Sequence, residues 1–300
     1  MSGISPEILR QVKRIELQTR RLVNSRFVGE YHSVFKGQGM EFSEVREYQP
    51  GDEVRTVDWN VSARMRRLFV KRFVEERELT VLLIVDCSGS SRFGTGERDK
   101  QAMAAELAAV LALTATRNND RVGLLLCSDR IEHVVPPRKG RRHALRLVRD
   151  VLAWPSSSRG TDLAVALDWA ARVLTHHSVV FVISDFVTPP VERQLKLLSQ
   201  RHDLVAVVLD DPGERTLPNL GVVRLVDAET GRLAEIDTSR KEVRERYLRE
   251  LGTEREARQR LLRRLAIDEV LVRTERGYAE PLMRFFSARA RRGRKAARRG

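Results

Sequence analysis

The hydrophobic positions of this 300-residue chain follow two different periods. Residues 5–26 carry apolar side chains near helical spacing among many charges, which predicts a helix. From Leu79 onward, short continuous apolar runs alternate with longer amphipathic stretches. Continuous apolar runs are typical of strands covered on both faces, as in a parallel sheet between two helix layers. The pattern therefore predicts an α/β fold with a doubly wound, mostly parallel sheet.

The expected elements follow one another with short connections. Strands are predicted at 80–86, 121–127, 131–135, 179–185, 204–210 and 269–273, and helices at 99–117, 141–154, 162–174, 191–200 and 239–265, with a short helix from Pro281. The link before Ile131 is too short for a crossover helix, so the third strand should return as an antiparallel edge that Pro136 and Pro137 end. Two apolar runs at 222–226 and 232–236 flank a turn and predict a hairpin.

The chain before residue 79 has a different pattern of apolar and polar residues. Between Phe27 and Glu78, glycines and the turn Pro50-Gly51-Asp52 separate short mixed runs, which indicates strands and ordered loops. We therefore expect three parts. Residues 1–78 form a helix and strand/loop extension, residues 79–288 form the α/β domain with a C-terminal hairpin and helices, and residues 289–300 form a disordered basic tail.

Charge and cysteine content narrow the expected setting. The formal net charge is +14, and half of that excess lies in residues 289–300, which hold seven basic and no acidic side chains. Such a tail can touch nucleic acid or an anionic surface through charge alone, but without aromatic residues it does not read bases. A nucleic-acid partner is therefore not expected. Two cysteines without paired spacing, and no run of 18 apolar residues, favour a cytoplasmic protein without a membrane span.

Oxygen-bearing side chains gather where predicted strands end. Asp86, Ser88 and Ser90 follow the first strand of the sheet, Asp185 ends a later strand, and Thr161 precedes a helix. Ligands of open α/β sheets bind at the carboxyl ends of the strands, so these five side chains are expected to converge. Carboxylate and hydroxyl oxygens suit a hard cation such as Mg²⁺, or Mn²⁺ in its place. The sequence therefore predicts a metal site formed by Asp86, Ser88, Ser90, Thr161 and Asp185.

Each of these residues also has a simpler explanation. The spacing D-x-S-x-S arises by chance, Thr161 could be a helix N-cap, and Asp185 could be an ordinary strand-end residue. Asp210 and Asp211 end another strand at the same edge, where they could support the site or face a partner.

The metal residues resemble those of a known domain. Asp86, Ser88, Ser90, Thr161 and Asp185 match the metal-ion-dependent adhesion site of von Willebrand factor A domains, whose strand order is also similar. The resemblance implies that the hydroxyls bind Mg²⁺ and that the aspartates bind it directly or through water. It also implies that the open position of the ion takes a carboxylate from a partner protein.

A second resemblance covers nearly the whole chain. The segments 35–42, 46–52, 58–59 and 75–78 resemble the signature of the bacterial Domain of Unknown Function 58 family. Members of that family typically accompany MoxR-type AAA ATPases and are thought to act as adaptors in protein assembly or remodelling. For this chain the resemblance implies a soluble adaptor that contacts such an ATPase, or its client, through an acidic residue of the partner. Four charged residues of the region 37–59 are expected to form internal ion pairs rather than a site: Arg46, Arg55, Asp52 and Asp58.

The donor set favours binding over catalysis. Two carboxylates and three neutral hydroxyls leave a divalent ion incompletely neutralised, so it attracts a further carboxylate. A metal hydrolase also needs a placed base or nucleophile, and no histidine lies near the motif in sequence. The expected protein is thus not an enzyme. The alternatives are a Mg²⁺-dependent phosphohydrolase on a related fold, although Ser88 stands where such enzymes carry a second carboxylate, and association of the Arg-rich tail with nucleic acid or an anionic surface.

Overall fold

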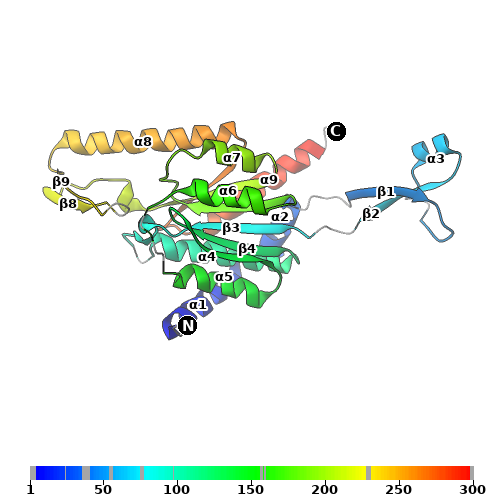
Figure 1. Ribbon diagram of the computed structural model, residues 1–300, viewed down its shortest axis with the longest axis horizontal. Coiled ribbons are helices and arrows are strands. Elements are labelled where there is room, and N and C mark those ends of the chain that lie inside the picture. Colours follow the sequence, from blue (N-terminus) through cyan, green and yellow to red (C-terminus); the bar gives the residue numbers. More distant parts are fainter. Residues whose placement is uncertain are drawn as a thin grey trace.

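A six-stranded sheet forms the centre of the computed structural model, which describes residues 5–23, 25–35, 41–53, 57–74, 78–96, 98–155, 158, 160–227 and 231–297 (Figure 1). The strand order is β10-β7-β6-β3-β4-β5, and all neighbouring pairs are parallel except β4 with β5. The strands are β3 (Thr80–Asp86), β4 (Arg121–Cys127), β5 (Ile131–Arg138), β6 (Ser178–Ser184), β7 (Asp203–Asp210) and β10 (Asp268–Arg273). The predicted fold class, with its antiparallel edge strand, is confirmed.

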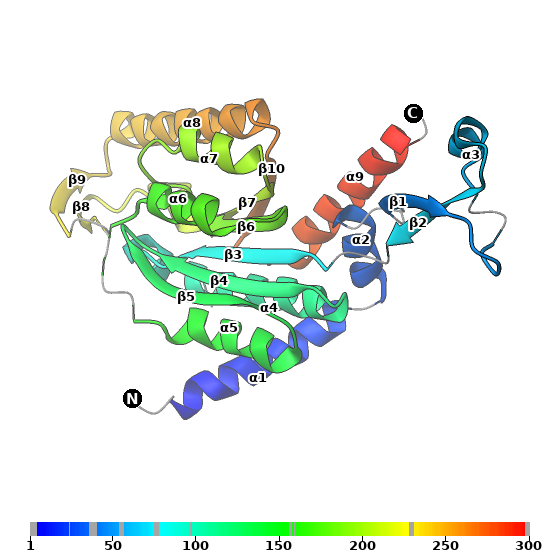
Figure 2. The same ribbon diagram turned by 45° about the vertical axis from the view of Figure 1, so that its right-hand side comes forward.

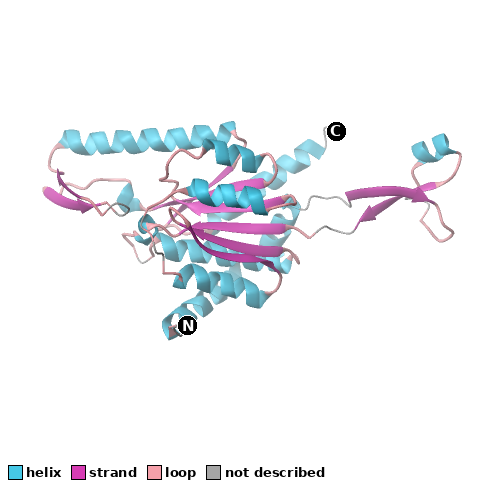
Figure 3. Ribbon diagram, viewed as in Figure 1, coloured by secondary structure: helices cyan, strands magenta, loops and turns pink. Residues whose placement is uncertain are grey.

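Helices cover both faces of this sheet, as Figures 2 and 3 show. Side chains of β3 alternate between two buried apolar clusters, with Val81 and Leu83 on one face and Leu82 and Ile84 on the other. The first cluster includes residues of α1 (Pro6–Leu22), α2 (Ser25–Phe35), α4 (Lys100–Arg117), α5 (Arg141–Ala153) and α9 (Ala279–Ala297). The second includes residues of α6 (Leu163–Val173), α7 (Glu192–Ser199) and α8 (Lys241–Arg264). The sheet is therefore buried on both sides, as its apolar strands require.

Strand β5 runs further than the sequence predicted. It continues through Pro136 and Pro137 to Arg138, so the expectation that these prolines end the strand is wrong. Because β5 is an edge strand, a residue without an N–H group can be accommodated there. Gly123 on β4 makes room for the second proline, since a Cβ atom at that position would lie 2.9 Å from the Cγ atom of Pro137.

The two ends of the chain pack together on one face of the sheet. The predicted helix over residues 5–26 is two helices, α1 and α2. Tyr31 and Phe35 of α2 contact Phe286 of α9, with ring centroids 6.0 Å apart in both pairs. Helix α9 then continues to Ala297, so residues 289–297 are helical and the expected disordered tail is wrong for them. Arg289 of that helix is paired with Asp203 and Asp268 and packs over the Phe35 ring.

The rest of the N-terminal extension forms an arm that projects from the body (Figure 1). In it β1 (Glu41–Glu47) and β2 (Phe69–Val74) pair antiparallel and carry the short helix α3 (Trp59–Met65). Arg46 and Asp52 form the expected ion pair, with N···O distances of 2.6 and 2.8 Å, whereas Asp58 caps α3 by accepting from two backbone N–H groups. The signature positions 36–40 and 75–77, and Arg55, lie outside the described residues.

A separate hairpin precedes α8. It consists of β8 (Val222–Val226) and β9 (Leu233–Asp237), close to the predicted bounds, while residues 228–230 of its turn lie outside the described part of the chain. Among the helices that the structure describes, none combines the length and the apolar character that a membrane crossing requires.

Candidate metal centre

Asp86 is the first of the predicted ligands, and its carboxylate is held from two sides. It is the last residue of β3 and is 5% exposed. The backbone N–H of Ser88 donates to its Oδ1 atom at 2.9 Å, and the Ser184 hydroxyl, from the end of β6, donates to Oδ2 at 2.7 Å. These bonds fix the orientation of the carboxylate, and each Oδ atom keeps a further lone pair for a cation.

Ser88 and Ser90 present their hydroxyls side by side. The chain leaves β3 in an extended conformation at Ser88 and then enters a short 3₁₀ turn over Gly89–Arg92. This turn brings the two Oγ atoms to 3.2 Å from each other. The structure therefore brings Asp86, Ser88 and Ser90 together, as predicted.

Thr161 and Asp185 lie at the same edge of the sheet, and both are more than nine-tenths buried. The residue after Thr161 donates its N–H group to the Ser128 carbonyl at 3.0 Å, which ties the loop to the end of β4, the neighbour of β3. Asp162, not Thr161, caps α6 by accepting from the Ala164 N–H at 2.9 Å. The simpler explanation of Thr161 as a helix N-cap is therefore wrong.

Two buried carboxylates influence each other at this edge. Burial, and then the neighbouring charge of Asp185, raise the pKa of Asp86 to about 6, against the partial opposition of its hydrogen bonds from Ser88 and Ser184. When ionisation of a carboxyl group is costly in the folded protein, a bound cation stabilises its charged form. The electrostatics of the site thus favour a bound positive charge beside Asp86.

The sequence did not indicate Lys100, which the structure places in the site. This first residue of α4 is 1% exposed, and its ammonium group contacts the Asp185 Oδ2 atom at 2.8 Å and the Glu214 Oε1 atom at 2.5 Å. Burial acts to lower the pKa of Lys100, but the two carboxylates outweigh it and the pKa is raised. Lys100 is therefore a permanent cation beside one of the predicted ligands. Only its position at the start of a helix, where lysine is unfavourable, could have signalled it.

The predicted residues fit a hard divalent cation by their chemistry. Five oxygen-bearing side chains lie at the carboxyl ends of the central strands or in the loop tied to the end of β4, and neither sulfur nor imidazole is among them. Within the described ranges no three His, Cys, Asp or Glu side chains form a cluster suited to a metal. Asp211 does not face a partner, since it is fully buried and accepts hydrogen bonds from the hydroxyls of Thr95 and Thr274.

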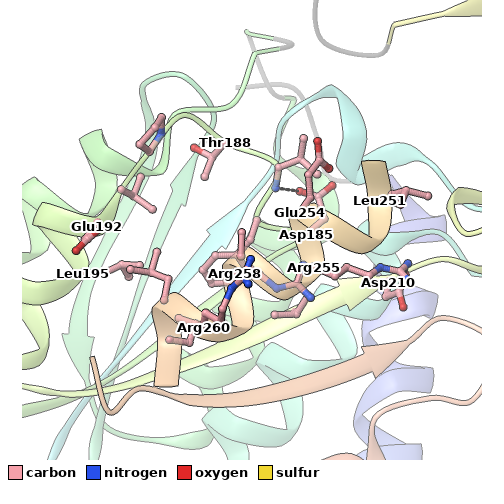
Figure 4. Close-up of a pocket in the computed structure, with 18 of the residues that line it drawn as sticks. Asp185, Thr188, Glu192, Leu195, Asp210, Leu251, Glu254, Arg255, Arg258 and Arg260 are labelled. Carbon is pink, nitrogen blue, oxygen red and sulfur yellow. Dashed lines mark hydrogen bonds and ion pairs between the residues drawn. The ribbon is translucent and has the colours of Figure 1, made fainter. Parts of the chain in front are cut away.

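A groove leads away from Asp185 between the loop 185–191 and α8 (Figure 4). Its volume is about 900 Å³, and apolar side chains such as Leu195 and Leu251 line it. Most charges on its walls are already paired, as Arg258 is with Glu269. Arg260 is exposed on the groove wall and has no ion pair among the described residues. The site therefore adjoins a groove of a size that accommodates several side chains of a partner.

Comparison with known proteins settles the family. The model of the protein family described as protein of unknown function DUF58 matches residues 44–257. The chain belongs to the DUF58 family. The uncharacterized proteins Mb1516 of Mycobacterium bovis and Rv1480 of Mycobacterium tuberculosis are each 32% identical to this DUF58 protein over 291 residues. Those alignments cover 95% of its chain and 91% of theirs.

Solved structures similar to this DUF58 protein include a bacterial protein and a VWA domain. BatB from Bacteroides thetaiotaomicron is 15% identical with a TM-score of 0.47, over 71% of this chain and 99% of that one. The SpRpn10 VWA domain is 13% identical with a TM-score of 0.34, over 46% of this chain and 78% of that one. The fold assignment rests on the strand order and helix layers of the DUF58 protein itself, which agree with a von Willebrand factor A-like sheet.

Proposed function

We propose that this DUF58 protein is a non-enzymatic, divalent-metal-dependent protein interaction module. The observation that carries the proposal is the meeting of Asp86, Ser88 and Ser90 with Asp185 at the carboxyl edge of the sheet. Asp86, Ser88, Ser90 and Thr161 would bind Mg²⁺ or Mn²⁺ directly, and Asp185 would bind it directly or through water. A donor set of three neutral hydroxyls and two carboxylates supports this proposal, because Mg²⁺ prefers oxygen ligands.

The bound ion would supply an electrophilic position for an Asp or Glu carboxylate of a partner. The residues of the chain prepare that position. The Ser88 N–H and the Ser184 hydroxyl orient the Asp86 carboxylate, and the Val187 N–H orients Asp185 by donating to its Oδ1 atom at 3.0 Å. Because these donors belong to the backbone or to buried side chains, the ligands are held before the metal arrives.

The partner that we propose is a MoxR-type AAA ATPase or a client of such an ATPase. The support comes from membership of the DUF58 family, since the resemblance to that family implies an adaptor that accompanies such an ATPase. An acidic residue of the partner would complete the metal coordination, and the residues beside it would lie in the groove along α8.

The direct test is capture of a purified MoxR-type ATPase from the same genome on the immobilised protein. Capture should require Mg²⁺ and should be lost in EDTA and in the Asp86→Ala variant. Asp168→Ala, on α6 outside the site, is the matched control and should behave as the natural protein. Equal capture in Mg²⁺ and in EDTA would refute metal dependence. Mg²⁺-dependent hydrolysis of a generic phosphate ester, lost in Asp86→Asn, would establish the phosphohydrolase alternative instead.

The groove gives a second prediction that separates partner binding from metal binding. Reversing the charge of Arg260 should weaken capture by about tenfold, because an acidic partner segment would meet a like charge at the groove wall. Arg260→Glu should leave the Mg²⁺ affinity nearly unchanged. The control is Arg263→Glu, an exposed position on the same helix that does not line the groove. Similar losses in both variants would show that only the net charge of α8 matters.

A further inference from the structure

Lys100 occupies a position that ordinary helix electrostatics disfavours. It begins α4, where the unpaired N–H groups of the first turn already present partial positive charge. Its ammonium group is also removed from water, which is costly for an unpaired ion. The contacts with Asp185 at 2.8 Å and with Glu214 at 2.5 Å are what hold a lysine there. Both partners come from the carboxyl ends of strands, β6 for Asp185 and the turn after β7 for Glu214.

The position of this cation matters for the metal site. Asp185 is a predicted ligand, and one of its oxygens is already bound by Lys100. Asp86, Asp185 and Glu214 bring three formal negative charges to this edge, and Lys100 cancels one of them. A divalent ion entering beside Asp185 would therefore meet a fixed positive charge a few ångströms away. In a site shielded from water, such repulsion is large compared with thermal energy.

We propose that Lys100 keeps the affinity of the site for the metal alone low, so that metal and partner carboxylate bind cooperatively. This inference rests on the proposed function. A partner carboxylate adds the negative charge that Lys100 removes, and the ion is held firmly only when that carboxylate is present. By linkage, the metal strengthens partner binding by the same factor as the partner strengthens metal binding. Lys100 thus makes the ion a connector between two proteins rather than a permanent part of one.

Two substitutions should change the metal affinity in opposite directions. Lys100→Met keeps an unbranched side chain only one atom shorter and removes its charge, so Mg²⁺ and Mn²⁺ should bind the full chain about tenfold more tightly or better. In Glu214→Gln, Asp185 is the remaining charged partner of Lys100 of the two described above, and a nearby negative charge is lost. The metal should therefore bind more weakly. The measurement is calorimetric titration of each protein with the metal in the absence of a partner.

Lys139→Met is the matched control for the change in net charge. Lys139 pairs with Glu78 just before β3, at the amino end of that strand and so at the end opposite Asp86. Removing the charge of Lys139 should leave the metal affinity unchanged. Equal affinities of the natural protein and Lys100→Met would overturn the role of Lys100 while leaving the metal-binding function intact. A lower affinity of Lys100→Met would also overturn it, because Lys100 would then serve to position Asp185.

Failure of the proposed function has a different signature. If neither the natural protein nor Lys100→Met binds Mg²⁺ or Mn²⁺ at millimolar concentrations, the metal site itself is refuted, and the inference with it. Circular dichroism of each variant shows whether it folds. Should Lys100→Met not fold, Lys100→Gln, which also removes the charge and can still donate a hydrogen bond to Asp185, takes its place: a tighter metal affinity supports the inference, and an unchanged or weaker affinity overturns it.

Discussion

The Asp86→Asn variant should unfold at a higher temperature than the natural protein when no divalent cation is present, and Mg²⁺ should no longer stabilise it. Asparagine has nearly the shape of aspartate, and its carbonyl oxygen can still accept the hydrogen bond from the Ser88 N–H. What the substitution removes is a buried negative charge beside Asp185. The expected gain at neutral pH is about 1–3 kcal/mol, the upper value being the cost of a pKa raised by about two units.

The stability difference between Asp86→Asn and the natural protein should depend on pH. The pKa of Asp86 is about 6 in the folded chain and 3.8 for an ordinary aspartate. Between these values the folded chain holds a proton that the unfolded chain has released, so its free energy of unfolding falls as pH rises. The advantage of Asp86→Asn should therefore be absent near pH 4, grow up to about pH 6, and stay constant above it.

Thermal melts at several pH values, with and without Mg²⁺, measure both parts. Increasing Mg²⁺ should raise the melting temperature of the natural protein, because the ion binds only the folded chain. Asp168→Asn, outside the site, should melt as the natural protein does. A melting temperature of Asp86→Asn that still rises with Mg²⁺ would mean that Asp86 is not a ligand.

Phe286→Ala should be among the most destabilising single substitutions, with a loss of about 3–5 kcal/mol in the free energy of unfolding. The Phe286 side chain is fully buried, and its ring contacts four others. Their centroids lie at 5.0 Å for Phe285, 5.1 Å for Phe27 and 6.0 Å for both Tyr31 and Phe35. Removing the ring leaves a cavity between α2 and α9, which come from opposite ends of the chain.

Chemical denaturation measures the loss, and limited proteolysis should show earlier cleavage in both α2 and α9. Trp59→Ala is the contrasting control, because the Trp59 side chain is 64% exposed on the projecting arm and should contribute little to stability. Cleavage confined to α9 would show that the aromatic cluster does not join the two ends of the chain.

The central strands could be predicted from sequence because strands that are buried on both faces consist mainly of continuous apolar residues. The run 81–85 is apolar throughout, and the strand 80–86 that contains it appears in the structure with the predicted bounds, as does the strand at 121–127. The order of Asp86, Ser88, Thr161 and Asp185 along the chain was enough to place them at one edge, since parallel strands share their carboxyl ends.

The features that could not be predicted depend on contacts between distant segments. Lys100 reads as a solvated lysine at a helix start, and its burial depends on where β6 and β7 end. Helix α9 extends into the basic tail because two contacts hold it against the body. Arg289 forms ion pairs with Asp203 and Asp268, and the Phe286 ring packs against α2. The continuation of β5 through two prolines likewise depends on its place at the edge of the sheet.

The prolines of β5 also limit how other proteins can approach the sheet. An incoming strand that extends a sheet needs exposed N–H and C=O groups along the edge it joins. Two consecutive residues of β5 lack an N–H group, so this strand offers an incomplete row of donors to an incoming strand. Strand addition, a common mode of peptide capture and of aggregation, is thereby disfavoured at the β5 edge of the six-stranded sheet.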